Sequence, residues 1–288
     1  MSLLAPFFRI LIVLGLVWTA SRTMIYLLPG DPAEFLVHES LVQTTPEALR
    51  SKMDLDRPIL NRIFSWPNSQ SLIKKESSPR LVGRAVENSL ILASLTLLLS
   101  LVFTGNALLA SFKDPHLRVF FLNLSALLAS IPIVVGGPIL LLIFSVWLKI
   151  FPPVQSPILP AFTLAFYLSA FWFRTFQAKI DHFLPESPAS GARARGISEN
   201  TVFFKYMLAP LAGSFAAYFG TQIGILFNSS LLVEIIFQWP GIGSLLADSV
   251  LSRDYPVIEL SLLVTSLTTL CSQQLGYSLQ KIWEPKLQ

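Results

Sequence analysis

Long apolar runs separated by short polar stretches dominate this chain. Six of these runs are about as long as the 20 or so residues that an α-helix needs to cross a bilayer. They cover residues 7–28, 86–110, 119–148, 157–177, 208–233 and 257–280. The composition agrees, since 53% of the 288 residues are hydrophobic and only 13% are charged. The pattern predicts an all-α integral membrane protein with six transmembrane helices.

The first apolar run has a competing interpretation as a secretory signal. Arg9 precedes its apolar centre, and Trp18-Thr19-Ala20 offers a candidate cleavage site. The apolar pattern nevertheless continues to Leu28 and is interrupted only by Arg22. An uncleaved first transmembrane helix is the better interpretation.

Lysine and arginine residues in the short loops predict the orientation of the chain. With the N-terminus inside, nine of them fall on the inner side: Arg9, Lys113, Arg118, Lys179, Arg193, Arg195, Lys205, Lys281 and Lys286. The short outer loops hold only Lys149 and Arg253. We therefore expect both termini to be cytoplasmic. The net charge of +4 is an orientation signal, and no basic cluster indicates a nucleic-acid partner.

The whole chain, residues 1–288, is expected to form one membrane domain with three notable connecting segments. The first, residues 29–84, is a long outer loop. In it Thr45 and Pro46 are placed to cap and begin a short helix. After residues 66–68 this loop turns polar and weakly patterned, which predicts a flexible connection.

The inner segment 178–207 is the second of these, and it is expected to contain two short helical pieces. Residues 189–195 form the first, and Gly196 suits the left-handed position that ends a helix. Ser198 is placed to cap the second piece. A soluble partner can grip such a short helix on the membrane face. The alternative is an amphipathic connector lying at the lipid interface.

The third segment, residues 235–256, is an outer loop with strong turn signals. Trp239-Pro240-Gly241 fits a type II turn, in which proline fixes φ and glycine supplies the positive φ that follows. Residues 243–250 predict a short helix that ends before Arg253-Asp254-Tyr255-Pro256. The aromatic residues of this loop also suit a belt at the membrane interface.

Little in the sequence supports catalysis. No phosphate-binding Gly-x-x-x-x-Gly-Lys-Ser/Thr loop occurs, and His38, His116 and His182 lie in loops or at membrane edges. The sequence contains no His/Cys cluster, and its single cysteine, Cys271, suits packing in the last run. We expect a non-enzyme that binds no metal and no cofactor itself.

Four ionisable residues lie within or beside the apolar runs, namely Arg22, Arg174, Glu234 and Glu259. All but Arg22 are expected near an interface, where a long side chain can reach water. No acidic residue is expected at the membrane midplane, as a proton- or sodium-coupled carrier requires. The driving force for any transport should therefore come from another subunit.

A polar stripe in the fifth run offers candidates for a translocation path. It comprises Gln222, Asn228, Ser229 and Ser230. These side chains either line a water-filled passage or form hydrogen bonds between helices, and the pattern favours neither.

Four motifs, in order along the chain, resemble the permease subunits of the dipeptide/oligopeptide/nickel class of ATP-binding-cassette (ABC) importers. They are Leu28-Pro29-Gly30-Asp31-Pro32, Leu55-Asp56-Arg57-Pro58, residues 192–198, and residues 233–243 with Arg253-Asp254-Tyr255-Pro256. The resemblance implies a type I ABC importer permease fold in the inner membrane of a bacterium. It also implies a second homologous permease, two cytoplasmic ATPases that bind ATP and Mg²⁺, and an extracytoplasmic binding protein, all within membrane lipid.

The resemblance also implies roles for individual residues. Ala192, Arg193, Arg195 and Gly196 would belong to the coupling helix that contacts the ATPase. The outer loop would face the binding protein through Trp239, Pro240, Gly241, Asp254 and Tyr255.

The chain departs from the family pattern at several positions. Ser190-Gly191-Ala192 stands where the family has Glu-Ala-Ala, and Gly191 should weaken that helix by roughly 1 kcal/mol. Residues 69–79 replace a Gly-Asp-Leu-Gly-like segment, and Glu284-Pro285-Lys286 replaces Asp-Pro-Arg. The sequence thus indicates a divergent permease, with di- or oligopeptides as the expected substrate. Nickel or metal chelates, glutathione, antimicrobial peptides and a non-transporting scaffold remain alternatives.

Overall fold

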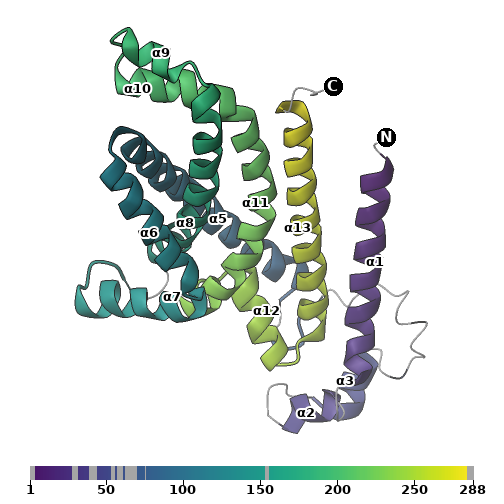
Figure 1. Cartoon of the computed structure of the whole chain (residues 1–288). Helices are drawn as coiled ribbons and strands as arrows, with labels where there is room; N and C mark the ends of the chain where they lie inside the picture. Colours follow the sequence, from purple (N-terminus) through teal and green to yellow (C-terminus); the bar gives the residue numbers. More distant parts are fainter. Residues whose placement is uncertain are drawn as a thin grey trace. The chain divides into compact units, whose positions relative to one another are not determined.

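The computed structural model describes residues 4–27, 32–38, 44–52, 56, 61, 70–74, 76–152 and 156–283. The regular secondary structure of these residues is helical, and an isolated antiparallel bridge joins Gln70 to Ser77. The chain divides into two compact units (Figure 1). The first combines Met1–Ser89 with Pro240–Cys271, and the second combines Leu90–Trp239 with Ser272–Gln288.

Helices from both ends of the sequence build the first unit. They are α1 (Leu4–Leu27), α2 (Pro32–His38), α3 (Pro46–Lys52), α12 (Ile242–Leu251) and the beginnings of α5 (Ser78–Lys113) and α13 (Tyr255–Trp283). Thr45 precedes α3 as predicted, and its Oγ1 accepts a hydrogen bond from the Ala48 N–H at 3.4 Å. Two of the predicted motifs, residues 28–31 and most of 55–58, lie outside the described residues.

The second unit is built around α8 (Ile158–Phe183), which packs against both α6 and α11. Its helices are the rest of α5 from Leu90, α6 (Pro115–Ser130), α7 (Ile133–Leu141), η1 (Leu142–Trp147), α8, η2 (Leu184–Glu186), α9 (Ala189–Ala194), α10 (Glu199–Thr201), η3 (Val202–Leu208), α11 (Ala209–Ile236) and the end of α13 from Ser272. Trp172, Phe173 and Phe176 of α8 are almost fully buried. They anchor the largest apolar cluster among the described residues.

Four described helical segments are long and apolar enough to cross a membrane. They are Ser78–Lys113, Ile158–Phe183, Glu199–Gly220 and Tyr255–Leu275, and a bent pair of helices would make a fifth. By helix length and hydropathy, the described residues thus fit a membrane protein with several spans. The number of six spans and the inward position of both termini stay predictions.

The apolar run over residues 119–148 does not form one continuous helix. Helix α6 ends at Ser130, and the next helix begins at Ile133 after a bend of 104°. Pro132 explains the break, because it lacks an N–H and forces the preceding residue out of the helical conformation. Ile131 accordingly has extended backbone angles, φ −95° and ψ 119°.

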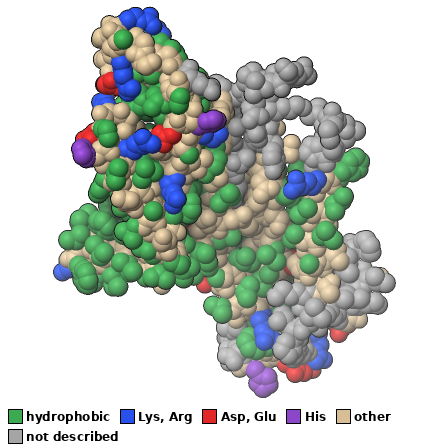
Figure 2. All heavy atoms as spheres, in the orientation of Figure 1, with side chains coloured by type: hydrophobic (Ala, Val, Ile, Leu, Met, Phe, Trp, Pro, Cys, Tyr) green, Lys and Arg blue, Asp and Glu red, His purple; other side chains and the backbone are tan. Residues whose placement is uncertain are grey.

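The segment after this bend is apolar on its surface as well as inside. Val134, Val135, Ile139 and Trp147 are exposed hydrophobic residues of α7 and η1. Figure 2 shows hydrophobic side chains covering this part of the second unit. Such a surface suits contact with lipid or with another membrane subunit.

Gly136 allows α7 to pass close to α8. A Cβ atom at Gly136 would lie 1.6 Å from the Tyr167 hydroxyl oxygen, whereas one at Gly137 would lie 3.5 Å from Ile236 Cδ1. We expect Gly136→Ala to lower the free energy of unfolding by about 1–3 kcal/mol, because Tyr167 must move. Thermal unfolding of the purified protein in detergent measures this loss. The matched Gly137→Ala variant should be neutral or stabilising, and equal losses in both variants would contradict the steric argument.

Candidate functional site

The predicted short helix and bend in the inner segment are confirmed. Helix α9 is followed by Gly196 with φ +75°. The Gly196 N–H donates to the Arg193 carbonyl at 2.9 Å, and the Ile197 N–H donates to the Ala192 carbonyl at 3.2 Å. These two bonds form a Schellman motif, which requires the left-handed residue that glycine adopts without strain.

Helix α9 is seated on the second unit through its alanines. Ala189 and Ala192 are fully buried, and they belong to the same apolar cluster as Val202, Phe203 and Met207. The family resemblance predicts that Ala192 contacts the ATPase, but its side chain is buried against its own chain. The exposed residues of this segment are Ser190, Gly191, Arg193, Ala194, Arg195 and Gly196.

The two arginines of this segment have different surroundings. Arg193 donates to the Glu199 carboxylate through Nε at 2.8 Å and through Nη2 at 3.0 Å. Its guanidinium also lies over the Phe112 ring, 4.7 Å from the centroid. Arg195 is exposed, and its Nε donates to the Gly191 carbonyl at 3.1 Å.

Ser198 occupies the predicted N-cap position, but its side chain makes no capping bond to the backbone. Its ψ of 144° is that of a cap residue, and its Oγ lies 2.9 Å from Thr201 Oγ1 instead. The Val202 N–H donates to the Ser198 carbonyl at 3.0 Å, which starts the helix. The prediction is therefore right about the boundary and wrong about the contact.

The predicted type II turn at Trp239-Pro240-Gly241 is wrong. Gly241 has φ −91° and ψ −173°, which is extended backbone, whereas Gln238 has φ +51°. The Trp239 N–H donates to the Glu234 carbonyl at 2.8 Å, and the Gln238 N–H donates to the Ile235 carbonyl at 3.3 Å. The left-handed residue is thus the one that closes α11 in a Schellman motif, and it comes before the proline.

Both sides of this loop are anchored within their own units. In the second unit the Trp239 side chain packs in an apolar cluster with Leu92, Leu159, Ala161, Leu164, Val233 and Phe237. In the first unit the Pro240 carbonyl accepts a hydrogen bond from Asn88 Nδ2 at 2.9 Å. The Ile242 N–H, directly after Gly241, donates to Ser89 Oγ at 2.9 Å.

Asp254 binds part of the first outer loop, residues 29–84, which is distant from it in the sequence. Its carboxylate accepts hydrogen bonds from Ser71 Oγ and, at 3.1 Å, from the Leu72 N–H. Ser71 Oγ in turn accepts from the Ile73 and Lys74 N–H groups. Burial raises the pKa of the Asp254 carboxyl above its ordinary value, although these hydrogen bonds oppose the shift. The expectation of a flexible connection after residues 66–68 is therefore wrong for residues 70–74, which form a hydrogen-bonded turn.

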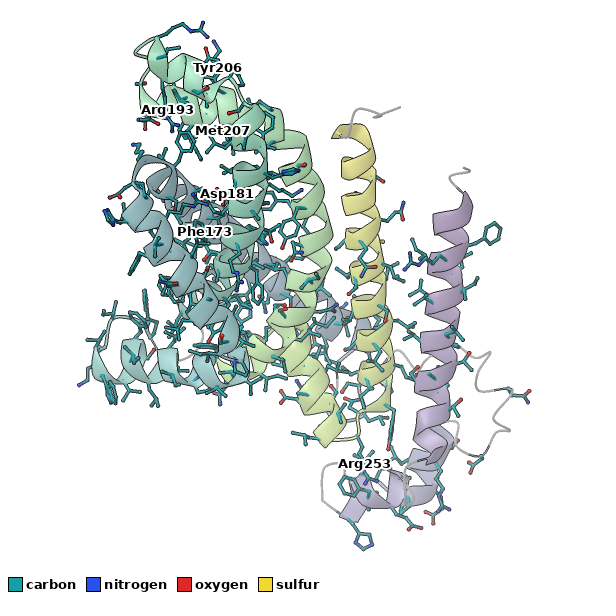
Figure 3. The ribbon with its side chains drawn as sticks, in the orientation of Figure 1. Phe173, Asp181, Arg193, Tyr206, Met207 and Arg253 are labelled. Carbon is teal, nitrogen blue, oxygen red and sulfur yellow. The ribbon has the colours of Figure 1, made fainter. Side chains whose placement is uncertain are left out.

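The neighbours of Asp254 extend this anchor. Arg253 has φ +54°, and its guanidinium carbon lies 3.8 Å from the centroid of the Phe35 ring (Figure 3). Tyr255 is buried against an apolar cluster that includes Ala33, Leu36 and Leu49. Residues 253–255 thus contact α2, α3 and the turn after Gln70. We call this assembly the outer cap, and it comprises residues 32–38, 44–52 and 70–74.

Glu234 and Glu259 are expected near an interface, but their side chains are buried. Contact with water therefore does not explain how a charged side chain is accommodated at these two positions. Glu259 pairs with Arg22 at 3.2 Å, and both side chains are only 5% exposed. Arg22 also lies over the Trp18 ring, 4.8 Å from its centroid. Glu234 is fully buried and accepts a hydrogen bond from Ser230 Oγ at 3.3 Å. The sequence showed the four charges but not their partners.

Part of the polar stripe lines a cavity of about 510 Å³ in the second unit. Its walls are Leu128, Ala129, Ile131, Pro132, Ile133, Leu164, Tyr167, Leu168, Phe171, Tyr218, Gln222, Ile225, Leu226 and Ser229. Gln222 and Ser229 are therefore brought together, whereas Asn228 is exposed and outside the lining. Tyr167 and Tyr218 were missed, because single tyrosines in apolar runs give no pattern.

Comparison with known proteins gives this geometry a context. The sequence profile of the family "Binding-protein-dependent transport system inner membrane component" matches residues 104–288. The chain is 28% identical over 257 residues to the glutathione transport system permease protein GsiC of Escherichia coli K12, with 84% of each chain covered. The GsiC protein of Shigella flexneri serotype 5b matches to the same extent.

A solved structure shows that the fold is shared more widely. A chain in the crystal structure of an amino acid ABC transporter with histidines matches with a TM-score of 0.57 and 15% identity. The match covers 70% of this chain and 94% of that chain. At this identity the likeness concerns the fold alone.

Proposed function

The chain belongs to the family of binding-protein-dependent transport system inner membrane components, and we propose that it forms half of the translocation pathway of a peptide importer. As a member of that family it is a multi-pass inner-membrane permease subunit of an ABC importer, and it is not an enzyme. Membership also implies an ATPase and a substrate-binding protein as partners. The proposed assembly adds a second homologous permease and two ATPase subunits, which bind ATP and Mg²⁺.

The observation that carries the coupling role is the geometry of α9. A short helix is fixed to its own chain by buried Ala189 and Ala192 and ends in a left-handed glycine. Its outward residues are small or basic, so a partner can approach the backbone closely. This surface is our proposed contact with the ATPase, and of the four residues predicted for that contact Arg193, Arg195 and Gly196 are exposed. ATP binding in the partner would then shift the permease between its two access states.

The cavity in the second unit is our candidate for part of the pathway. Gln222, Ser229 and the two tyrosines place neutral hydrogen-bonding groups among aromatic and aliphatic walls. None of the cavity's lining residues is charged. Main-chain amides of a peptide and its apolar side chains fit such a surface, whereas a highly charged chelate would lack a counter-charge. Asn228 is exposed and would contribute only if another subunit covers it.

Glutathione is the second candidate substrate. The relatives named above are glutathione permeases at 28% identity, and glutathione is itself a small peptide with amide groups. Its net negative charge distinguishes it from neutral dipeptides. The binding protein would make the first selection, so the two substrates must be separated by uptake assays.

The outer loop residues have a proposed role that differs from direct contact. Trp239, Asp254 and Tyr255 are buried, and Pro240 offers its carbonyl to Asn88. They are suited to holding the outer cap and the loop in the shape that the binding protein meets. Gly241 begins α12 within the same loop.

Purification and transport test the proposed function together. The tagged chain, extracted in mild detergent from its native host, should bring a second permease and an ATPase. The complex in proteoliposomes, with its binding protein, should take up labelled neutral dipeptides in an ATP-dependent manner. Recovery of the chain without an ATPase would favour a non-transporting scaffold, and uptake of glutathione but not dipeptides would favour the second candidate.

Gly196→Val is expected to abolish coupled uptake while leaving the permease folded. A β-branched residue at φ +75° carries a local strain of about 1–2 kcal/mol or more, and the end of α9 must rearrange. Uptake and ATP hydrolysis by the reconstituted complex measure the effect. Gly105→Val, in α5 and outside this segment, is the matched control, since a Cβ there would meet no atom within 4 Å. Unchanged uptake by Gly196→Val would refute the importance of this bend.

A further inference from the structure

Arg193 and Arg195 are two positions apart, yet Arg193 contacts other helices of its own chain, whereas the hydrogen bond of Arg195 stays within α9 and its C-cap. The Arg193 guanidinium uses its edge and its face at once. Its edge donates two hydrogen bonds to Glu199, and its face covers the Phe112 ring. A guanidinium held in this way has a fixed plane, and two of its five N–H donors are already bonded to its own chain.

The contacts of Arg193 join three elements. Arg193 itself lies in α9, and Glu199 begins α10, whose helix runs on through η3 into α11. Phe112 lies in the last turn of α5, and its ring packs on Phe203 with centroids 5.4 Å apart. Arg193 therefore connects the short helix to two long helices on opposite sides of it in the sequence.

Arg195 has a different environment. Its side chain is exposed, and its Nε bond to the Gly191 carbonyl stays within the same helical turn. Ser190, Gly191 and Ala194 are the exposed small residues of the same helix. Together they form a low surface beside Arg195, which suits a shallow partner groove that carries an acidic group.

We infer that Arg193 is a positioning residue that transmits movement of α9 to α5 and α10, and that Arg195 is the cation that contacts the ATPase. This inference rests on the proposed function, and it reassigns one of the two arginines within the coupling segment. It also explains why position 193 holds arginine and not lysine. A lysine side chain cannot donate the two-bond fork to Glu199 and at the same time stack on the Phe112 ring.

The experiment separates docking from coupling in the assembled complex. The variants are Arg193→Ala, Arg193→Lys, Glu199→Gln and, as the matched comparison, Arg195→Ala. For each, the affinity of the ATPase for the permease pair in nanodiscs is measured by titration. The number of substrate molecules imported per ATP hydrolysed is measured in proteoliposomes. Thermal unfolding checks that each variant is folded.

Both Arg193 variants should keep an ATPase affinity within about threefold of wild type and lose about tenfold in import per ATP, because docking survives while transmission fails. Glu199→Gln should change in the same direction by less. Arg195→Ala should lose about tenfold in ATPase affinity, with import per ATP unchanged in the complexes that form.

The opposite pattern would overturn the inference. Arg193→Ala with a tenfold weaker affinity and normal import per ATP would make Arg193 a contact residue. Full activity of Arg193→Lys, or of Arg195→Ala in both assays, would also overturn it. A wild-type chain that binds no ATPase would instead refute the proposed function itself, so the two failures are distinguishable.

Discussion

Arg22→Ala is expected to lower the free energy of unfolding by about 3–5 kcal/mol, because it leaves the Glu259 carboxylate buried without its counter-charge. The two side chains are each only 5% exposed, and they join α1 to α13 within the first unit (Figure 1). Arg22 also loses its contact with the Trp18 ring in this variant. A charge in a membrane helix is costly to bury, so its partner becomes a strong determinant of helix association.

Thermal unfolding of the purified protein and the yield of membrane-inserted chain measure this effect. Thr19→Ala, one turn earlier in α1, is the control, because it removes only a hydroxyl that bonds to the Gly15 carbonyl. The double variant Arg22→Met/Glu259→Leu should recover most of the loss, since neither charge is then stranded. A single variant as stable as wild type would show that the pair is not buried in the membrane.

Local features of the structure were the most predictable from the sequence. Thr45 and Pro46 predicted the start of α3, and Gly196 predicted the bend after α9. Each rests on the backbone preference of one residue within a few positions of its partner. The break at Pro132 followed the same rule, but the uninterrupted apolar pattern around it concealed the signal. Hydropathy reports burial and is insensitive to helix direction.

Long-range pairs could not be predicted in the same way. Ser71 and Asp254 are 183 residues apart, and neither has a spacing that indicates the other. Arg22 and Glu259 were visible as rare charges in apolar runs, but one charge does not identify its partner. The prediction of a type II turn at Pro240 is wrong for a different reason. The left-handed position is occupied by Gln238, since the end of α11 sets the geometry there.

The same limit applies to the candidate sites. The sequence placed Arg193 and Arg195 in one basic segment, because both have the same charge and similar hydropathy. Only the structure separates them, through Glu199 and Phe112. In the cavity, Gln222 and Ser229 were candidates from helical spacing, whereas Tyr167 reaches it from another helix. Residues from different helices that line one site are recognised only in the three-dimensional structure.

Asp254→Ala is expected to release the turn of the outer cap. The variant leaves the buried Ser71 Oγ and the partly buried Leu72 N–H without their acceptor. The local free energy of opening should fall by about 2–4 kcal/mol. Amide hydrogen exchange at Leu72, in the full protein in nanodiscs, measures it, and exchange should become at least about tenfold faster. Asp248→Ala removes an exposed carboxylate from neighbouring α12 and should leave this exchange unchanged.

The pH dependence of the outer cap separates the charge of Asp254 from its hydrogen bonds. Burial raises the pKa of this carboxyl above 3.8, so the folded cap binds more protons than the unfolded chain between 3.8 and the raised pKa. The contribution of Asp254 to stability is therefore full below 3.8 and declines as the pH rises through the raised pKa. Asp254→Asn keeps an acceptor without the charge. The free energy of opening derived from Leu72 exchange, after correction for the intrinsic exchange rate at each pH, should then no longer depend on pH. Exchange should still be slower than in Asp254→Ala. An identical pH profile in wild type and Asp254→Asn would show that the carboxylate is hydrated, and the buried anchor would have to be abandoned.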